Sequence, residues 1–432
     1  MTSYLEKFGS AKERSGGRAS PQFQKPDVPG DAKAPDFFHT TECQVALLTG
    51  GADKPYALGL ASALVSLNVF VDFIGSDEID GPGLHGTPLV NFLNLRGDQR
   101  TDVGRLSKLL RVLKYYVKLI SYTAKAKPKI FHILWNNKFE LFDRTILMLY
   151  YKLFGKRIVF TAHNVNAGKR DLNDSFVNRL TLKIQYTLAD HILVHSERMK
   201  QELTADFDMA ESKVSVIPFG INNTVPNTGL ASSDAKRALG VSEHQNTLLF
   251  FGNIAPYKGL EYLIPALAEL RKDGGDYQLI IAGRPKGCEP HWKEMQQRME
   301  QCGIRGCVIE KIEYIPDEQV ELYFKAADLL VLPYNHIFQS GVLFLGYSFG
   351  LPAVVTAVGS MPEEVVAGRT GLVCRAKDAQ DLAKAIATYF ASDLFKQLAT
   401  RRRDIQAYAN ERYSWAKVGE ITKRIYSGLI RR

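Results

Sequence analysis

Residues 329–366, LLVLPYNHIFQSGVLFLGYSFGLPAVVTAVGSMPEEVV, constrain the fold more than any other stretch of the chain. The apolar start predicts a buried strand at 329–332, which Pro333 ends because proline cannot donate a ladder hydrogen bond. A loop ending at Ser340-Gly341 precedes a predicted helix at 342–349, with Gly350 as its left-handed terminator. A second strand, at 353–358, runs into another glycine loop and a helix start at Glu363.

Two glycine-bearing loops therefore precede two helix N-termini within one short stretch. This arrangement presents bare backbone N–H groups, which bind anions such as a diphosphate. The other interpretation is ordinary loop punctuation in an α/β domain. The stretch alone does not decide between them.

Length and composition set the scale of the fold. A chain of 432 residues predicts two domains of roughly 150 to 200 residues each. The apolar content of 45% and the charged content of 23% are those of an ordinary soluble protein. The net charge of +9 favours an anionic partner, which could be nucleic acid, an acidic membrane surface or a phosphorylated small molecule.

Several segments argue against other classes of protein. The five cysteines show no CxxC pair and no His/Cys metal spacing, so we expect no metal site and a reducing, cytoplasmic location. No run of eighteen apolar residues predicts a transmembrane helix, and the N-terminus lacks an apolar signal core. Residues 1–40 are poor in apolar side chains and are predicted to be a flexible tail.

The predicted first domain, residues 41–220, begins with a strand at 44–49, the pair Gly50-Gly51 and a helix at 56–67. This succession is typical of a Rossmann half, although the full G-x-G-x-x-G is absent. A later strand at 157–162 ends at His163, at the edge where open α/β sheets bind ligands. A capping or loop role for His163 stays open. Further strands are predicted at 90–95, 130–134, 191–195 and 213–217, and helices at 140–154, 176–188 and 197–203.

The most amphipathic stretch is the predicted helix at 101–127. Its apolar side chains recur at helical spacing, and we expect that face to pack on the sheet. They are Leu106, Leu109, Leu110, Leu113, Val117 and Ile120. The basic face at 105–118 has two interpretations, a solvated exterior or contact with anionic lipid headgroups. Its members are Arg105, Lys108, Arg111, Lys114 and Lys118.

The Asn/Thr/Pro/Ser-rich segment 222–233 marks a domain boundary. The predicted second domain, residues 221–411, repeats the α/β pattern, and a last helix falls within 412–432. Two doubly wound halves would face each other across a cleft. A negatively charged donor fits the wall that carries Lys258 and Arg284, where loop N–H groups and basic side chains would meet phosphate.

Ten segments, in order along the chain, resemble the glycosyltransferases of family 4. They are LLTGG at 47–51, TAHNV at 161–165, ADHILVHSE at 189–197, VIPFGIN at 216–222, FFGNIAPYKGLEYLI at 250–264, IIAGRP at 280–285, ADLLVLPY at 327–334, SFGLPAVV at 348–355, GSMPEEV at 359–365 and YSWAKV at 413–418. The resemblance implies an α/β protein of GT-B fold, with two Rossmann-like doubly wound domains facing across a cleft. It also implies transfer of a sugar from a nucleotide-sugar with retention of anomeric configuration.

The resemblance also assigns residues. Gly50 and Gly51 would lie near the donor diphosphate and the acceptor, and His163 would contact the donor sugar. Lys258 would bind the diphosphate, and Asn253 occupies the position of a further phosphate contact; Arg284 is expected beside them because it falls on the same predicted wall of the cleft. Glu363 would sit near the donor sugar, and Ser340, Gly341 and Val342 would offer backbone amides. The helix after Trp415 would cross back to the first domain.

The implied substrates are a nucleotide-sugar donor and a lipid-linked or saccharide acceptor, as in cell-envelope or exopolysaccharide synthesis. The negative charge of the leaving nucleoside diphosphate would be stabilised by N–H groups and basic side chains. No metal or other cofactor is then required, and the pair Asp206 and Asp208 is expected to be a solvated loop. The protein would be cytoplasmic and could lie on the inner face of the membrane. Nucleic-acid binding is not favoured, because no such motif accompanies the basic charge.

Three positions depart from the family pattern. The family usually has an arginine where this chain has Asn253, which cannot supply a charge. Its two glutamates would fall near Ile337 and Leu345, both apolar here. Replacements for the ribose contact are sought among Ser340, Tyr334, Tyr347 and Gln339. The alternative function is a catalytically silent subunit that binds a partner enzyme or a glycan.

Overall fold

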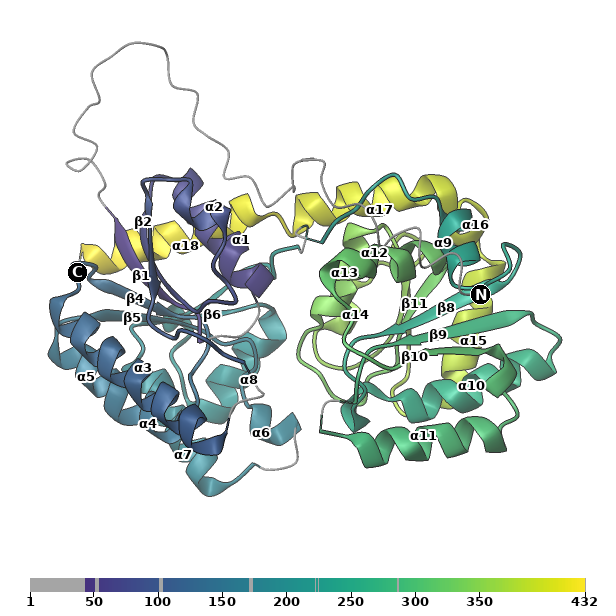
Figure 1. Ribbon diagram of the computed structural model, residues 1–432, viewed down its shortest axis with the longest axis horizontal. Coiled ribbons are helices and arrows are strands. Elements are labelled where there is room, and N and C mark those ends of the chain that lie inside the picture. The colour runs from purple at the N-terminus through teal and green to yellow at the C-terminus, as the bar shows by residue number, and fades with distance from the viewer. Residues whose placement is uncertain are drawn as a thin grey trace, which may run out of the picture.

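The computed structural model describes residues 43–50, 54–100, 104–170, 174–221, 223, 225–285 and 287–431. The predicted tail at 1–40 and Gly51 lie outside these ranges. Two parallel sheets, each flanked by helices, form two units side by side (Figure 1). The α/β fold class is thereby confirmed.

The first sheet has seven strands in the order β3-β2-β1-β4-β5-β6-β7. They are β1 (Gln44–Leu48), β2 (Phe70–Gly75), β3 (Val90–Asn94), β4 (Ile130–Ile133), β5 (Arg157–Thr161), β6 (His191–Val194) and β7 (Val214–Val216). Alternate side chains of β1 enter two different cores, Ala46 and Leu48 one, Val45 and Leu47 the other. The sheet is therefore covered on both faces, as parallel sheets require.

The helices of this unit are α1 (Lys54–Ser66), α2 (Pro82–His85), α3 (Arg105–Lys125), α4 (Glu140–Phe142), α5 (Met148–Leu153), α6 (Ala167–Arg170), α7 (Phe176–Leu188) and α8 (Glu197–Phe207), with a 3-10 turn η4 (Glu211–Lys213). The prediction of one uninterrupted helix at 140–154 is wrong. A π-helical turn, η3 (Asp143–Leu147), separates α4 from α5.

The second sheet has the order β10-β9-β8-β11-β12-β13. Its strands are β8 (Asn246–Phe251), β9 (Tyr277–Ala282), β10 (Val308–Lys311), β11 (Leu329–Leu332), β12 (Ala353–Thr356) and β13 (Gly371–Cys374). Its helices are α9 (Ser232–Ala238), α10 (Leu260–Lys272), α11 (Glu289–Gln301), α12 (Asp317–Ala326), α13 (Gly341–Ser348), α14 (Met361–Glu364), α15 (Ala379–Ala391), α16 (Asp393–Lys396) and α17 (Leu398–Arg412), with short turns η5 (Pro256–Lys258) and η6 (Arg305–Cys307). Neither β13 nor α9 was predicted.

Gly350 ends α13 as the sequence predicts. Its φ is +65°, and a Cβ at this position would lie 2.2 Å from the carbonyl oxygen of Arg402 on α17. A side chain is therefore excluded by both the backbone conformation and the neighbouring helix. The turn sets the direction from which β12 enters the sheet.

The last helix, α18 (Trp415–Ile430), leaves the second unit and packs on α1 of the first (Figure 1). Its Tyr426 hydroxyl lies 2.6 Å from Nδ1 of the buried His132 on β4. At its start, the Trp415 ring rests on Gly59 and Gly220, where an added Cβ would lie 2.2 and 2.3 Å from it. The two units are thus joined by the linker at 217–231 and by this helix.

The orientation predicted for α3 is wrong. The helix buries Tyr115, Tyr116, Leu119 and Thr123 against the sheet, whereas Leu106, Leu110 and Val117 are exposed. The two tyrosine rings fill more of the core than leucines would, and their hydroxyls bond to Asn137 (2.7 Å) and Asp143 (2.9 Å). The leucine stripe is consequently exposed on the side of α3 that faces away from the sheet.

Candidate active site

A pocket of about 290 Å³ lies between the two units, and we call it the interdomain pocket. Its volume is close to the lower end of the usual range for small-molecule sites, roughly 300 Å³. One wall comes from the first unit, the linker and α18: Pro55, Tyr56, Phe219, Gly220 and Trp415. The other comes from the second unit: Tyr257, Lys258, Tyr334, Ile337, Gln339, Ser340, Gly341, Val342 and Leu345.

Lys258 supplies positive charge to this pocket from a buried position. It ends the short turn η5 after β8, and its Nζ donates to the Tyr334 hydroxyl at 3.0 Å. Burial lowers the pKa of Lys258, but the hydroxyls of Tyr334 and Tyr257 outweigh that effect and the pKa lies above its ordinary value. The side chain is therefore an ammonium ion at neutral pH, hydrogen-bonded to the Tyr334 hydroxyl.

A close approach of two loops fixes this lysine. Gly259 follows it with a φ of +71°, and a Cβ there would lie 1.8 Å from the carbonyl oxygen of Pro333. The loops after β8 and β11 can touch only because this residue is glycine. Lys258 and Tyr334 are brought together by that contact.

The N-terminus of α13 is part of the second wall of the interdomain pocket. Ser340 is its N-cap residue, but its hydroxyl makes no capping bond and instead lies 3.3 Å from the Tyr334 hydroxyl. Helix N-termini carry N–H groups without intrahelical partners, and the backbones of Gly341 and Val342 occupy these positions beside the pocket. A buried ammonium and a helix N-terminus therefore face the same space.

An aromatic cluster backs the first wall. The His163 ring stacks on Trp135 with centroids 4.2 Å apart, and Tyr56 meets His163 edge-on at 4.7 Å. His163 Nδ1 lies 3.0 Å from Nε2 of His195, and its own Nε2 is buried without a hydrogen-bond partner among the described residues. Gly50, φ +63°, lies against Trp135, since a Cβ there would be 2.5 Å from its carbonyl oxygen.

Both histidines are neutral at physiological pH. Burial holds the pKa of His163 well below its ordinary value, and the neighbouring His195 and His132 lower it further. Burial also lowers the pKa of His195 to about 4. The first wall is therefore aromatic and uncharged, in contrast to the ammonium ion on the second.

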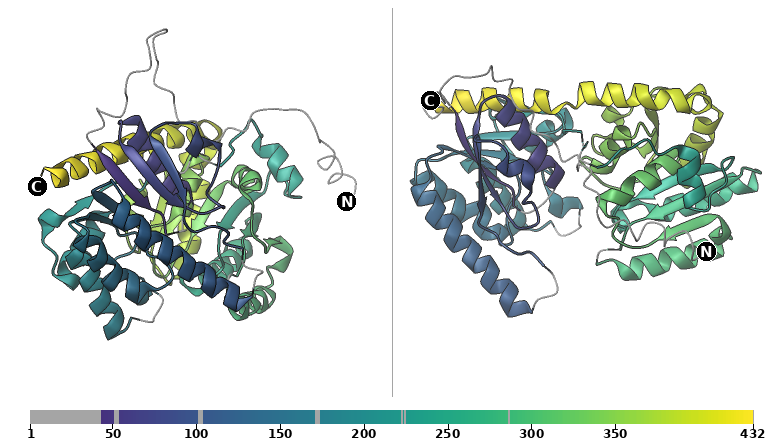
Figure 2. Two further views of the ribbon diagram at one scale, coloured as in Figure 1. Left: turned by 60° about the vertical axis from the view of Figure 1, so that its left-hand side comes forward. Right: turned by 45° about the horizontal axis from the view of Figure 1, so that its top comes forward.

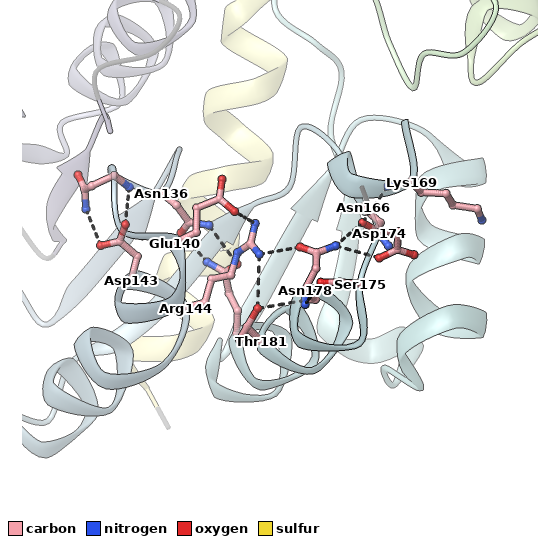
Figure 3. A network of polar contacts seen from close by, with 12 residues as sticks. Asn136, Glu140, Asp143, Arg144, Asn166, Lys169, Asp174, Ser175, Asn178 and Thr181 are labelled. Carbon is pink, nitrogen blue, oxygen red and sulfur yellow. Dashed lines mark hydrogen bonds and ion pairs between the residues drawn. The ribbon is translucent and has the colours of Figure 1, made fainter. Parts of the chain in front are cut away.

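A polar network fixes the loop that carries His163 (Figure 3). The Arg144 guanidinium donates to Asn178 on α7 (2.9 Å) and pairs with Glu140 (2.6 Å). Asn178 in turn donates to the buried Asn166, three residues after His163 (2.9 Å). The helices of the first unit thus hold the loop after β5 in place.

The structure brings only some of the predicted site residues together. Lys258, Ser340, Gly341 and Val342 line the interdomain pocket, and His163 contacts Tyr56 on its opposite wall. Asn253, Arg284 and Glu363 are exposed and do not line it. The Arg284 guanidinium instead lies over the ring of Tyr314, 5.4 Å from its centroid.

The neighbouring carboxylate, Glu364, is buried instead of Glu363. It accepts a hydrogen bond from the Tyr413 hydroxyl and one from Gln339 (3.4 Å), which lines the pocket. Burial raises the pKa of Glu364. Sequence reasoning missed this residue because two adjacent glutamates carry no signal as to which one points inward.

The two apolar departures from the family pattern do face the pocket. Ile337 and Leu345 both line it. Of the polar candidates named as replacements, Ser340, Tyr334 and Gln339 are in the lining, whereas Tyr347 bonds to the Glu364 carbonyl (3.0 Å) and Thr370 (3.1 Å).

Sequence reasoning also missed Tyr56, Trp135, His195, Phe219 and Trp415. His195 carried a usable signal, since it follows β6 at the same edge of the sheet as His163 follows β5. The aromatic side chains come from four separate segments and meet only in the folded chain. Within the described ranges, no group of three His, Cys, Asp or Glu side chains could hold a metal ion.

Comparison with known proteins agrees with this architecture. Residues 54–224 match the family described as Glycosyltransferase Family 4, and residues 232–412 match Glycosyl transferases group 1. D-inositol 3-phosphate glycosyltransferases from Corynebacterium efficiens and Corynebacterium diphtheriae are 27% identical over 287 residues and 28% identical over 280. These alignments cover 62% of this chain and only 65% and 64% of those proteins.

Among solved structures, sucrose-phosphate synthase from Thermosynechococcus elongatus gives a TM-score of 0.72 at 19% identity, covering 90% of this chain and 100% of that one. Anabaena HepE in complex with UDP-glucose gives 0.68 at 17%, covering 89% and 99%. These likenesses confirm the GT-B fold. The two family matches together span most of the chain, which therefore belongs to the glycosyltransferases, with a family 4 domain followed by a group 1 domain.

Proposed function

We propose that the protein transfers a sugar, with retention, from a nucleotide-diphosphate sugar to a lipid-linked or saccharide acceptor in cell-envelope or exopolysaccharide synthesis. The observation that carries the proposal is the buried ammonium of Lys258 beside the N-terminus of α13 in the interdomain pocket. Both features bind phosphate oxygens. The HepE structures, which hold UDP or UDP-glucose, make UDP-sugars the first donors to test.

In this mechanism the leaving nucleoside diphosphate gains negative charge as the glycosidic bond breaks. Lys258 and the N–H groups of Gly341 and Val342 would stabilise that charge more strongly in the transition state than in the ground state. His163, neutral and with an unpartnered Nε2, would contact the donor sugar across the pocket. The leaving phosphate would take the proton of the acceptor hydroxyl. Arg284 has no part in this account, because it lies outside the pocket.

The acceptor side is supported by an apolar face on the first unit. All but four of the exposed large hydrophobic side chains in the described residues lie on α3, on α4–α5 with its flanks, or on α7. They are Leu106, Leu109, Leu110, Leu113, Val117, Phe139, Leu141, Ile146, Leu149, Leu153, Phe154, Phe176, Val177 and Leu180. These helices contact one another and lie together on the side of the sheet away from α18 (Figures 1 and 2).

Such a concentration of exposed apolar side chains marks an interaction site. Lys114, Lys118 and Lys125 are exposed along α3 next to it. Apolar side chains flanked by lysines suit the boundary between headgroups and acyl chains of an anionic membrane, where each lysine contributes about 1 kcal/mol. No helix in the described ranges is long and apolar enough to span a membrane. We therefore propose peripheral attachment through this apolar face, on the inner side of the membrane.

One observation favours the second candidate, a silent glycosyltransferase-like subunit. Ile337 and Leu345 present apolar side chains to the pocket, so it lacks acidic acceptors for sugar hydroxyls at these positions. Calorimetric titration with a panel of UDP-, GDP- and ADP-sugars, followed by assay of donor hydrolysis, separates the two candidates. The enzyme predicts binding and slow hydrolysis of at least one donor. Absence of binding across the panel would leave the silent subunit as the better account.

A further inference from the structure

A second cation-rich pocket, of about 260 Å³, lies within the first unit, and we call it the basic pocket. Five of its nine lining residues are basic: Arg96, Arg100, Lys108, Arg111 and Lys138. The others are Gln99, Val112, Tyr115 and Asn137. None of the described residues that line it is a carboxylate.

Buried polar groups hold the basic pocket in shape. Asp143, in the π-helical turn, accepts from the Asn137 backbone N–H (2.9 Å) and side-chain amide (3.1 Å). Asn137 then accepts from Arg96 (2.8 Å) and from the Tyr115 hydroxyl (2.7 Å). The Arg96 guanidinium lies over the Tyr115 ring, 4.8 Å from its centroid. These hydrogen bonds fix the positions of the side chains around the basic pocket, whereas the side chains in a cluster of exposed lysines are not held in place.

Part of the donor capacity of this pocket is unused. The Nε–H of Arg96 is buried and has no hydrogen-bond partner among the described residues. Asp98 pairs with Arg100 (2.8 Å) and Arg111 (3.6 Å), and Asp143 lies behind Asn137. Among the described residues, two carboxylates therefore stand against five cations, which leaves an excess of positive charge. An oxyanion with several acceptor oxygens would satisfy these donors.

The position of the basic pocket connects it to both features of the acceptor side. Trp135 stacks on His163, and Asn137 comes two residues after Trp135. The Cα atoms of Trp135 and Asn137 are therefore at most about 7 Å apart. On its other side the pocket is lined by Lys108, Arg111 and Val112 of α3, whose neighbours Leu109 and Leu113 belong to the apolar face. The basic pocket thus lies next to the aromatic cluster behind the first wall on one side and next to the apolar face on the other.

We propose that the basic pocket binds a phosphate or diphosphate group carried by the acceptor, and so places the acceptor sugar toward His163. This inference rests on the proposed function and specifies its acceptor class. The phosphate could belong to a lipid-linked sugar, whose chain would continue over Leu109 and Leu113, or to a soluble sugar phosphate. The two share one headgroup chemistry and differ only in the apolar chain.

The test measures anion binding in the full chain, separately from activity. Every protein carries Lys258→Ala, so that the interdomain pocket contributes no cation. The site variant adds Lys108→Ala and Lys138→Ala, and the matched control adds Lys272→Ala and Lys293→Ala, two exposed lysines of α10 and α11. Calorimetric titrations use inorganic pyrophosphate, glucose 1-phosphate, farnesyl diphosphate and farnesol, and thermal midpoints verify that each variant is folded.

We expect pyrophosphate binding to weaken at least ~10-fold in the site variant and to stay unchanged in the control, because each charged hydrogen bond contributes about that factor. Tighter binding of farnesyl diphosphate than of pyrophosphate would show that the apolar chain adds affinity and would support the lipid-linked source, whereas equal or weaker binding, with glucose 1-phosphate also bound, would support the soluble one. Equal binding to both variants, or no binding of any phosphate to the parent, would overturn the proposal. The proposed function fails in a different experiment, namely when the chain with Lys258 intact binds no nucleotide-sugar.

Discussion

The interdomain pocket and the basic pocket hold positive charge in different ways. In the first, one lysine is buried, bonded to the Tyr334 hydroxyl and fixed by a glycine contact between two loops. In the second, five cations surround a space whose rim includes the exposed Lys138 and Arg100. A single desolvated cation suits one group held in a fixed geometry, whereas an open cluster suits a headgroup that arrives from solvent or from a membrane.

The helices of the two units differ in how completely their apolar side chains are covered. In the second unit the apolar side chains of α10, α12 and α15 enter one core. In the first unit α3, α5 and α7 leave the apolar face uncovered. The difference supports the proposed small-molecule role of the second unit and the proposed surface-binding role of the first.

The largest effect is expected from Lys258→Ala. Removal of a preorganised donor to transition-state charge lowers turnover by about 100-fold or more. Because Lys258 is proposed to bind the donor diphosphate, the loss should appear in donor binding and turnover and leave the acceptor KM unchanged. Steady-state kinetics with varied donor and acceptor measure both quantities.

Lys272→Ala, on the exposed end of α10, is the matched control and should retain full activity. A normal turnover number for Lys258→Ala would remove the donor assignment. A change confined to the acceptor KM would reverse the roles given to the two pockets.

The next effect concerns the apolar face. Leu110→Ser with Leu113→Ser should weaken binding to vesicles of mixed phosphatidylcholine and phosphatidylglycerol by at least ~10-fold, since each buried leucine contributes about 1.5–3 kcal/mol. Flotation of the full chain on a density gradient measures the bound fraction. The control pair Val366→Ser and Val373→Ser removes exposed apolar side chains from the second unit and should float like the wild type. Equal flotation of both pairs would contradict membrane attachment through the apolar face.

A smaller effect is expected where the start of α18 packs on the first unit. Gly59→Ala places a Cβ where the Trp415 ring lies, and the overlap should lower stability by about 1–3 kcal/mol. Gly428→Ala, on α18 itself with no atom within 4 Å of the new Cβ, should instead raise stability by up to ~1 kcal/mol through helix propensity. The urea midpoints of the two variants measure these opposite changes in stability. The same sign for both would mean that Trp415 is not held as described.

The smallest effect is a pH dependence of the uncharged first wall. The pKa of folded His195 is about 4, below its unfolded value of about 6.5, so the unfolded chain binds more protons between these values. Its contribution to stability is present above pH 6.5 and is lost as the pH falls toward 4. Urea midpoints from pH 7 to pH 4.5 should fall less steeply for His195→Asn than for the wild type. Identical slopes would show that His195 is not buried in its neutral form.

Much of the fold could be predicted because parallel strands are short apolar runs closed by glycine or proline. Two of the missed elements lacked that signal. β13 has only four residues and begins at Gly371, and α9 lies next to a segment rich in Asn, Thr and Pro. The outward orientation of α3 could not be predicted, because hydrophobic periodicity marks an apolar stripe without saying what covers it.

The sequence predicted the residues that line the interdomain pocket where a single lysine or a single loop identifies the position, as at Lys258 and the Ser340 loop. It did not predict which of two adjacent side chains on a helix is buried. Glu363 and Glu364 differ by about 100° around the helix axis, and only the second is buried. Clusters built from distant segments, such as Tyr56 with Trp135, His163 and Trp415, require the tertiary structure itself.

A crystal structure of the protein with a bound nucleoside diphosphate tests the central assignment most directly. The account predicts the diphosphate in the interdomain pocket, with oxygens about 2.7–3.2 Å from Lys258 Nζ and from the backbone N–H groups of Gly341 and Val342. A diphosphate bound by Arg96 and Lys138 in the basic pocket, with Lys258 still bonded only to Tyr334, would contradict it.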